Sequence, residues 1–171
     1  MPIVKNNVYG RSIEMLLRNI MEAKHKVVIS ANPSTKLNDA VNLLVTNNIG
    51  CLPVLDDDEK LIGIISERDI LNMVNQEISQ LAEKTVGDIM TKKLIKGSPE
   101  DNLSKIAEIM EENKIRHLPI VKGEKVIGLI SLWEIYRAKM QNMETENRTL
   151  SHMLHGRDKT GDYDMVTESD K

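Results

Sequence analysis

The 171-residue sequence is poor in aromatic side chains, which make up 2% of it and include no phenylalanine. Hydrophobic residues still reach 40%, so the core must be packed from isoleucine, leucine, valine and methionine. The lack of aromatic stacking platforms and the net charge of -3 argue against a nucleic-acid-binding protein, which needs a basic surface.

The single cysteine, Cys51, excludes a disulfide within the chain and predicts a reducing, cytoplasmic location. No apolar run approaches the roughly 18 residues of a membrane helix, so no membrane partner is expected. The histidines are scattered, and the chain has neither a Walker loop nor a G-x-G-x-x-G motif. Because no nucleophile–base pair appears either, we expect no metal site, no required cofactor and no enzyme activity.

One pattern of strand, helix and hairpin occurs twice along the chain. Pro53 and Pro119 are 66 residues apart, and Ser66 and Ser131 are 65 apart. A single residue lost in the second hairpin turn explains the change of offset. A register held this well indicates an internal duplication.

Apolar spacing and turn residues predict the elements of each copy. In the first copy we expect a helix over 11–22 capped by Ser12, a strand at 27–29, a helix opened by Asn32-Pro33, and strands 49–55 and 61–65. In the second we expect a strand at 94–95, a helix opened by Ser98-Pro99 with Asp101 closing a capping box, and strands 115–120 and 126–130. A last helix begins at Leu132 and continues to about residue 154, and a disordered tail follows.

These elements predict the division of the chain. The expected parts are an N-terminal extension 1–10, a first repeat 11–77, a linker 78–85, a second repeat 86–141, and a C-terminal helical extension with a disordered tail 142–171.

Each repeat runs from a glycine-led strand directly into a helix, at residues 63–70 and again at 128–135. Ser66 with Asp69, and Ser131 with Glu134, have the spacing of a capping box, which satisfies backbone groups at a helix N-terminus. From spacing alone, a purely structural role and a ligand-binding role both remain open.

The tandem order of these motifs resembles a pair of cystathionine-β-synthase (CBS) domains, also called a Bateman module, over roughly residues 12–140. The segments 86–91 and 115–119 are also typical of small CBS-pair proteins of bacteria or archaea. The resemblance implies an α+β fold in which two β-α-β-β-α repeats pack about a pseudo-twofold axis, with helical extensions at both ends. It also implies a homodimer that binds AMP, ADP, ATP or another adenosine-containing molecule and regulates an unidentified protein partner. NAD(H) and S-adenosylmethionine are further candidate ligands.

The resemblance assigns ligand contacts to two clefts between the repeats. The main cleft is expected to use the following residues: Ser66, Asp69, Leu94, Ile95, Arg116, His117 and Pro119. In it, Asp69 would hold the ribose, and Arg116 and His117 would face the phosphates, to which an arginine fork is well suited.

The second cleft is expected to use the following residues: Val28, Ile29, Cys51, Pro53, Arg68, Ser131 and Glu134. Gly50 and Cys51 stand where the main cleft has Arg116 and His117, so we expect this cleft to bind more weakly or to select a less charged ligand. Trp133 is expected to pack at the interface, with stacking on a ligand as the alternative. The alternative for the whole protein is a dimerisation or scaffold module whose clefts are vestigial.

Overall fold

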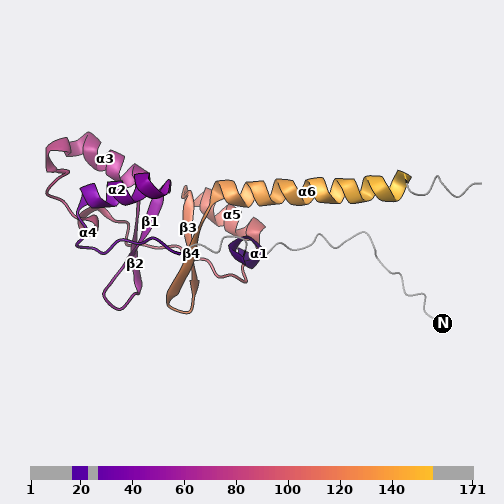
Figure 1. Ribbon diagram of the computed structural model, residues 1–171, viewed down its shortest axis with the longest axis horizontal. Helices are drawn as coiled ribbons and strands as arrows, with labels where there is room; N and C mark the ends of the chain where they lie inside the picture. The colour runs from indigo at the N-terminus through magenta and orange to yellow at the C-terminus, as the bar shows by residue number, and fades with distance from the viewer. Residues whose placement is uncertain (1–16, 23–26, 156–171) are drawn as a thin grey trace, which may run out of the picture. The chain divides into compact units, whose positions relative to one another are not determined.

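The computed structural model describes residues 17–22 and 27–155. Its backbone divides into two compact units, one that ends at Ile135 and one that begins at Tyr136. The first unit contains both repeats, and each repeat has helices and a two-stranded antiparallel sheet (Figure 1). The α+β class predicted from the sequence is therefore confirmed. The N-terminal extension, the Ser12 cap and the tail after residue 155 lie outside the described residues.

The described elements follow one another in this order: α1 Leu17–Glu22, α2 Leu37–Asn47, β1 Cys51–Leu55, β2 Leu61–Ser66, α3 Glu67–Glu77, η1 Ile78–Gln80, α4 Val86–Ile89, α5 Leu103–Glu112, β3 His117–Lys122, β4 Lys125–Ser131 and α6 Leu132–His155.

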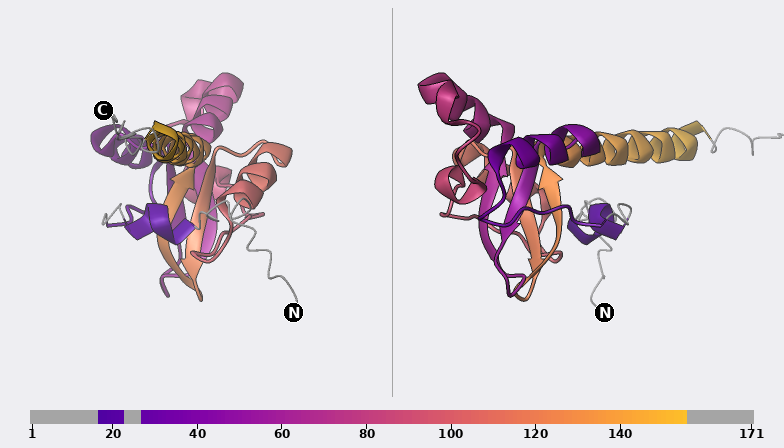
Figure 2. Two further views of the ribbon diagram at one scale, coloured as in Figure 1. Left: turned by 90° about the vertical axis from the view of Figure 1, so that its right-hand side faces the viewer. Right: turned by 60° about the vertical axis from the view of Figure 1, so that its left-hand side comes forward.

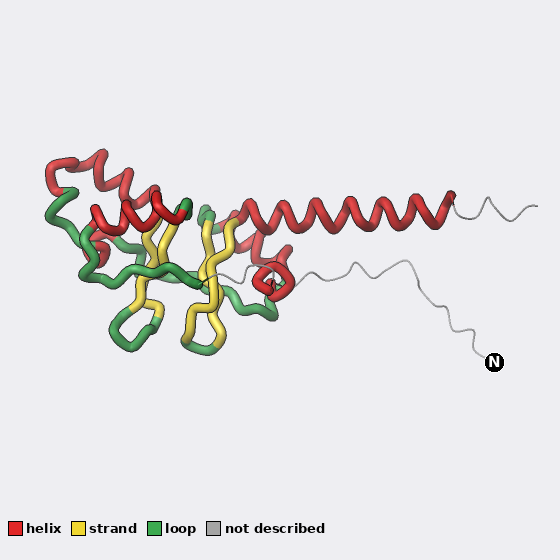
Figure 3. The backbone as a smooth tube through the Cα atoms, viewed as in Figure 1, coloured by secondary structure: helices red, strands yellow, loops and turns green. Residues whose placement is uncertain are grey.

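The two hairpins, β1–β2 and β3–β4, lie side by side with their turns on the same side (Figures 2 and 3). They share one register, because Cys51 pairs with Ser66 in the first and His117 pairs with Ser131 in the second. Each ladder also shifts at the equivalent point, after Val54 and after Ile120. The duplication inferred from the sequence is thus repeated in three dimensions.

The strands predicted at 27–29 and 94–95 are wrong. In place of each strand, the chain forms a single parallel bridge a few residues later, from Ala31 to Val54 of β1 and from Gly97 to Ile120 of β3. Ala31 donates its N–H to the carbonyl of Pro53 at 3.0 Å, and Gly97 donates to that of Pro119 at 2.9 Å. To extend either ladder toward the predicted strand, residue 53 or residue 119 would itself have to donate an N–H. Proline has none, so each ladder ends after one residue.

The predicted starts of the two central helices are also wrong, since α2 begins at Leu37 and α5 at Leu103. The Asn32-Pro33 and Ser98-Pro99 segments form separate turns, closed by backbone bonds from Thr35 to Asn32 and from Asp101 to Ser98. Asx and hydroxyl side chains favour such local turns as readily as helix caps.

The apolar spacing of these helices places one face of each in a core, with Val41 of α2 only half-buried. The buried positions are Leu37, Ala40 and Leu44 in α2, and Leu103, Ile106, Ala107 and Met110 in α5.

Each repeat has its own core, and the two short helices α1 and α4 are exchanged between them. Leu17 of α1 lies in the core of the second repeat, while Val86 of α4 lies in the core of the first. Backbone bonds fix both crossings: Arg18 donates to Pro99 at 2.9 Å, and Gly87 donates to Pro33 at 2.8 Å. The core of the second repeat is therefore covered by α1, which precedes the first repeat's helix α2 in the sequence. The core of the first repeat is covered by α4, which follows the linker.

The second unit is represented in the described residues by α6, which extends to His155 as one continuous helix. The predicted helix up to about residue 154 is confirmed.

Candidate ligand-binding pocket

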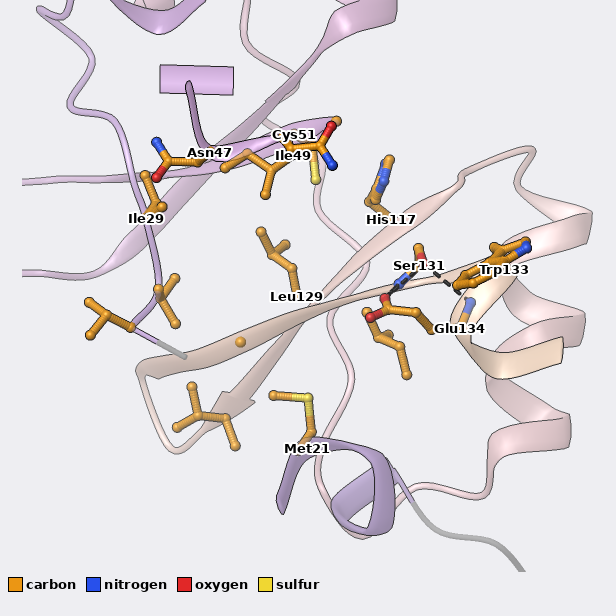
Figure 4. Close-up of a pocket in the computed structure, with 17 residues that line it drawn as sticks. Met21, Ile29, Asn47, Ile49, Cys51, His117, Leu129, Ser131, Trp133 and Glu134 are labelled. Carbon is orange, nitrogen blue, oxygen red and sulfur yellow. Dashed lines mark hydrogen bonds between the residues drawn. The ribbon is translucent and has the colours of Figure 1, made fainter. Parts of the chain in front are cut away.

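A pocket of about 730 Å³ lies between the two repeats of the first unit (Figure 4). Residues 27–29 and 47–51 contribute one side of it, and residues 127–131 with Trp133 and Glu134 contribute the other. Met21 and His117 complete the lining. A molecule bound there would contact both repeats at once.

Strand β4 builds one wall because its side chains alternate between core and pocket. Val126, Gly128 and Ile130 are buried, whereas Ile127 and Leu129 are half-buried; all of these except Val126 contribute to the pocket lining. At Gly128 the methyl end of Met21 packs on the bare Cα, where a Cβ would collide with it. A larger residue at this position would require the flexible end of the Met21 side chain to move.

His117 reaches this pocket because Gly50 has no side chain. A Cβ added at Gly50 would lie 3.1 Å from His117 Cε1 and 3.3 Å from Nε2. The imidazole comes from the first residue of β3, and it closes the pocket against the first repeat.

Ser131 and Glu134 form the polar end of the pocket, where β4 runs into α6 (Figure 4). Glu134 Oε2 accepts from the Ser131 backbone N–H at 2.8 Å and from Ser131 Oγ at 2.7 Å. The N–H of Glu134 returns a bond to Ser131 Oγ at 3.3 Å. A carboxylate has about four lone-pair sites, so these bonds orient Glu134 and leave it capacity to accept more.

Ser66 and Asp69 repeat this arrangement at the start of α3. Asp69 Oδ2 accepts from the Ser66 backbone N–H at 2.8 Å and from Ser66 Oγ at 2.6 Å. The structural interpretation of both junctions, a capping box, is therefore realised at both helices. Any contact of these residues with a ligand is therefore additional to their capping role.

Five of the residues predicted for the second cleft come together in this pocket. They are Val28, Ile29, Cys51, Ser131 and Glu134. The other two lie elsewhere: Pro53 is buried within β1, and Arg68 is exposed on α3. Trp133, considered for packing or for stacking, lines the pocket with 64% of its surface exposed.

The residues predicted for the main cleft are distributed differently. His117 lines the pocket of Glu134. Pro119 is buried in β3, Arg116 is exposed just before that strand, and Leu94 and Ile95 are half-buried in a segment without regular structure. Ser66 and Asp69 remain hydrogen-bonded to each other at the opposite junction.

Sequence reasoning missed Asn47, Asn48, Ile127 and Leu129 as lining residues. A strand predicted over 126–130 must turn every second side chain to its other face, and this was a signal for the last two. No local pattern indicated that the end of α2 would reach the pocket.

Among the described residues that line the pocket, Glu134, His117 and Cys51 are ionisable, and none is lysine or arginine. Within residues 17–22 and 27–155, no cluster of three or more histidine, cysteine or acidic side chains is arranged to hold a metal ion. In the same part of the chain, no helix has both the length and the hydropathy to cross a bilayer.

The chain belongs to the CBS-domain family, whose family model matches residues 18–75 and 86–141. CBS domain-containing protein CBSX3, mitochondrial, of Arabidopsis thaliana is 34% identical over 122 residues, covering 69% of this chain and 59% of that protein. The Bacillus subtilis protein YhcV is 26% identical over 128 residues, covering 75% of this chain and 89% of its own length. The chain spans about three fifths of the length of its Arabidopsis relatives CBSX3 and CBSX2.

Two solved structures of similar fold contain adenosine compounds. CBSX2 in complex with AMP matches with a TM-score of 0.57 and 35% identity, over 67% of this chain and 88% of that one. The CBS domain pair of protein MJ0100, in complex with 5′-methylthioadenosine and S-adenosyl-L-methionine, matches with a TM-score of 0.66 and 27% identity, over 74% and 97%.

Proposed function

We propose that this chain is a regulatory module that binds an adenosine-containing ligand in the pocket between its repeats. The observation that carries the proposal is the placement of Glu134, a carboxylate held by Ser131 at the rim of a nucleoside-sized pocket. Its remaining acceptor sites suit the two hydroxyls of a ribose. The AMP bound by CBSX2 and the adenosine compounds bound by MJ0100 support the same ligand class.

The walls of the pocket suit an adenine ring. Ile127 and Leu129 offer apolar side chains from β4, and Ile29 offers one from the facing segment. Val28 and Ile29 lie outside any described strand, so their backbone groups are in a position to bond the edge of a base.

The charge of the pocket favours a ligand with few phosphates. No described lysine or arginine lines it, and Glu134 would repel a polyphosphate placed nearby. We therefore expect adenosine or 5′-methylthioadenosine to bind here more tightly than ATP. The cleft of Asp69 and Arg116 remains our predicted site for a nucleotide phosphate.

A ligand that contacts both repeats would stabilise one arrangement of them over others, and this is how occupancy would be signalled to a partner protein. We expect that partner to be regulated through a homodimer of this chain, and we expect the module itself to be non-catalytic.

Titration calorimetry with 5′-methylthioadenosine, AMP and ATP tests the proposal on the wild-type chain and on Glu134→Ala. Loss of hydrogen bonds to a charged group should weaken 5′-methylthioadenosine about tenfold or more. Glu134→Gln is the matched control for capping, because its carbonyl still accepts from Ser131. Tighter binding of ATP than of 5′-methylthioadenosine, or an unchanged affinity in Glu134→Ala, would contradict the assignment.

One observation favours the scaffold alternative: both candidate carboxylates, Asp69 and Glu134, already serve as helix caps. A thermal-shift series with AMP, ATP, NADH and S-adenosylmethionine distinguishes the two functions, since a ligand that binds the folded state must raise its melting temperature. No shift with any of them would favour the scaffold.

A further inference from the structure

Helix α6 carries a row of exposed apolar side chains that begins near the end of the second repeat and continues after it. Tyr136, Met140, Met143 and Leu150 expose 40%, 63%, 62% and 53% of their surfaces. They are separated by steps of four, three and seven residues, which place them on one face of a helix. We call these four residues the α6 stripe.

The α6 stripe follows a heptad repeat of positions a to g, with apolar residues at a and d. In the sequence, the a positions are Met140, Asn147 and Leu154, and the d positions are Tyr136, Met143 and Leu150. Every other residue from 137 to 152 is polar or charged, apart from Ala138. A stripe confined to a and d is the narrow seam of a coiled coil, whereas a helix packed on a globular core has a wider apolar face.

We propose that the α6 stripe is the seam of a parallel, two-stranded coiled coil formed with a second copy of this chain. In the described part of the second unit, α6 is the only element, so no second helix or strand of that part covers the exposed face of Met140, Met143 and Leu150. Most of the stability of a helix in a protein comes from the packing of its apolar face, and an exposed stripe leaves that contribution unused. A second copy supplies an identical stripe in matching register.

Asn147 sets the direction of the two helices. In a parallel, in-register pair, Asn147 meets Asn147 of the second copy, and the two amides hydrogen-bond across the seam. An antiparallel pair centred between Met140 and Met143 places Asn147 opposite the largely apolar ring of Tyr136. A buried amide without a good partner is costly, and a single asparagine at an a position is a known determinant of parallel dimers.

Charges beside the seam are compatible with this direction. Lys139 at a g position pairs with Glu144 at the next e position of the second copy. An antiparallel pair would instead join Arg137 to Glu144 and Lys139 to Glu146, but Glu146 already accepts a bond from Asn142 at 3.0 Å. Exposed ion pairs contribute little each, so the asparagine layer decides.

Cysteine cross-linking of the full chain tests the proposal. In the parallel coil, Leu150→Cys places two thiols opposite each other, and mild oxidation should convert most of the chain to a covalent dimer on a non-reducing gel. In the antiparallel alternative, the same positions lie about 25 Å apart along the axis. The natural Cys51 is buried with 3% exposed, so the wild-type chain should give no such band.

Thr145→Cys is the matched control, because residue 145 lies at an f position on the opposite face of α6. Its hydroxyl bonds the Gln141 carbonyl at 2.9 Å within the helix, away from the seam. Cross-linking of Leu150→Cys alone supports the coil. No cross-link at residue 150, equal cross-linking of both variants, or cross-linking of Met143→Cys without Leu150→Cys overturns it.

A second variant separates this seam from any other contact between copies. Met143→Glu, added to Leu150→Cys, should abolish the cross-link because it places two carboxylates in one layer of the seam. An undiminished cross-link would show that copies meet elsewhere and would overturn the proposal. Circular dichroism of each variant shows that the chain remains folded.

Discussion

His117 of the second repeat lies against the bare backbone of Gly50 in the first, where a Cβ would approach its Cε1 to 3.1 Å. Gly50 is not in the left-handed region, so its role here is space for the imidazole and not backbone freedom. The contact joins the repeats at the wall of the pocket, and it makes the pocket sensitive to a single methyl group.

Gly50→Ala should therefore displace His117 and weaken ligand binding without unfolding the chain. Overpacking by one methyl group at a site that can shift should cost about 1 kcal/mol of stability. We expect the affinity for 5′-methylthioadenosine, measured by calorimetry, to fall about three- to tenfold. An unchanged affinity would mean that His117 does not contribute to the ligand site.

Gly123→Ala is expected to lower the stability of the chain without changing its ligand affinity. Gly123 has a φ of 63° in the turn between β3 and β4, and no heavy atom lies within 4 Å of its missing Cβ. Alanine is strained in this region, so the free energy of unfolding should fall by roughly 1 kcal/mol. Denaturant unfolding should show this loss, while calorimetry should show wild-type ligand affinity.

Asp69→Ala should remove most nucleotide binding in the main cleft. It also removes a helix cap, at a cost of about 1 kcal/mol. Asp88→Ala is a matched control, because Asp88 Oδ2 accepts from the Thr85 N–H and Oγ1 at 2.7 and 2.9 Å in the same capping geometry. Both variants should lose stability to a similar extent, but only Asp69→Ala should lose AMP affinity. Equal affinities in the two variants would leave Asp69 with the capping role alone.

The pKa of Asp88 is lowered from its ordinary value of 3.8, first by the backbone hydrogen bond from Thr85 and then by that residue's hydroxyl. A lowered pKa in the folded state means that the ionised carboxylate stabilises the fold above pH 3.8 and that this contribution fades as the pH falls through the lowered value. The stability difference between the wild-type chain and Asp88→Asn should therefore be constant near neutral pH and shrink below pH 3.8. Unfolding curves at several pH values measure it, and a difference that grows in acid would contradict the assigned cause.

The hairpins and the apolar helix faces were predictable because period, turn residues and the offsets of 66 and 65 are local properties of the sequence. The two edge strands were not, because their length depends on a proline in the neighbouring strand. Pro53 and Pro119 were visible in the sequence, but their effect depends on which strand they face.

The candidate site was predicted to a similar degree. The pocket lining includes Ser131, Glu134, Ile29 and Cys51, which the family resemblance had assigned to the second cleft, and their contact with a ligand stays a prediction. The placement of His117 beside Gly50 depends on side-chain packing across the repeat interface, which no spacing encodes.

The exchange of α1 and α4 has a consequence for proteolysis. A cut within residues 78–85 would leave α1 on the N-terminal fragment, whereas the core that α1 covers would be on the C-terminal fragment. It would likewise leave α4 on the C-terminal fragment, whereas the core that α4 covers would be on the N-terminal fragment. Neither fragment would be complete alone, because Leu17 and Val86 would each be separated from the core that buries it. The two pieces should therefore remain associated as a non-covalent complex, and pieces made separately should recover a folded module when mixed.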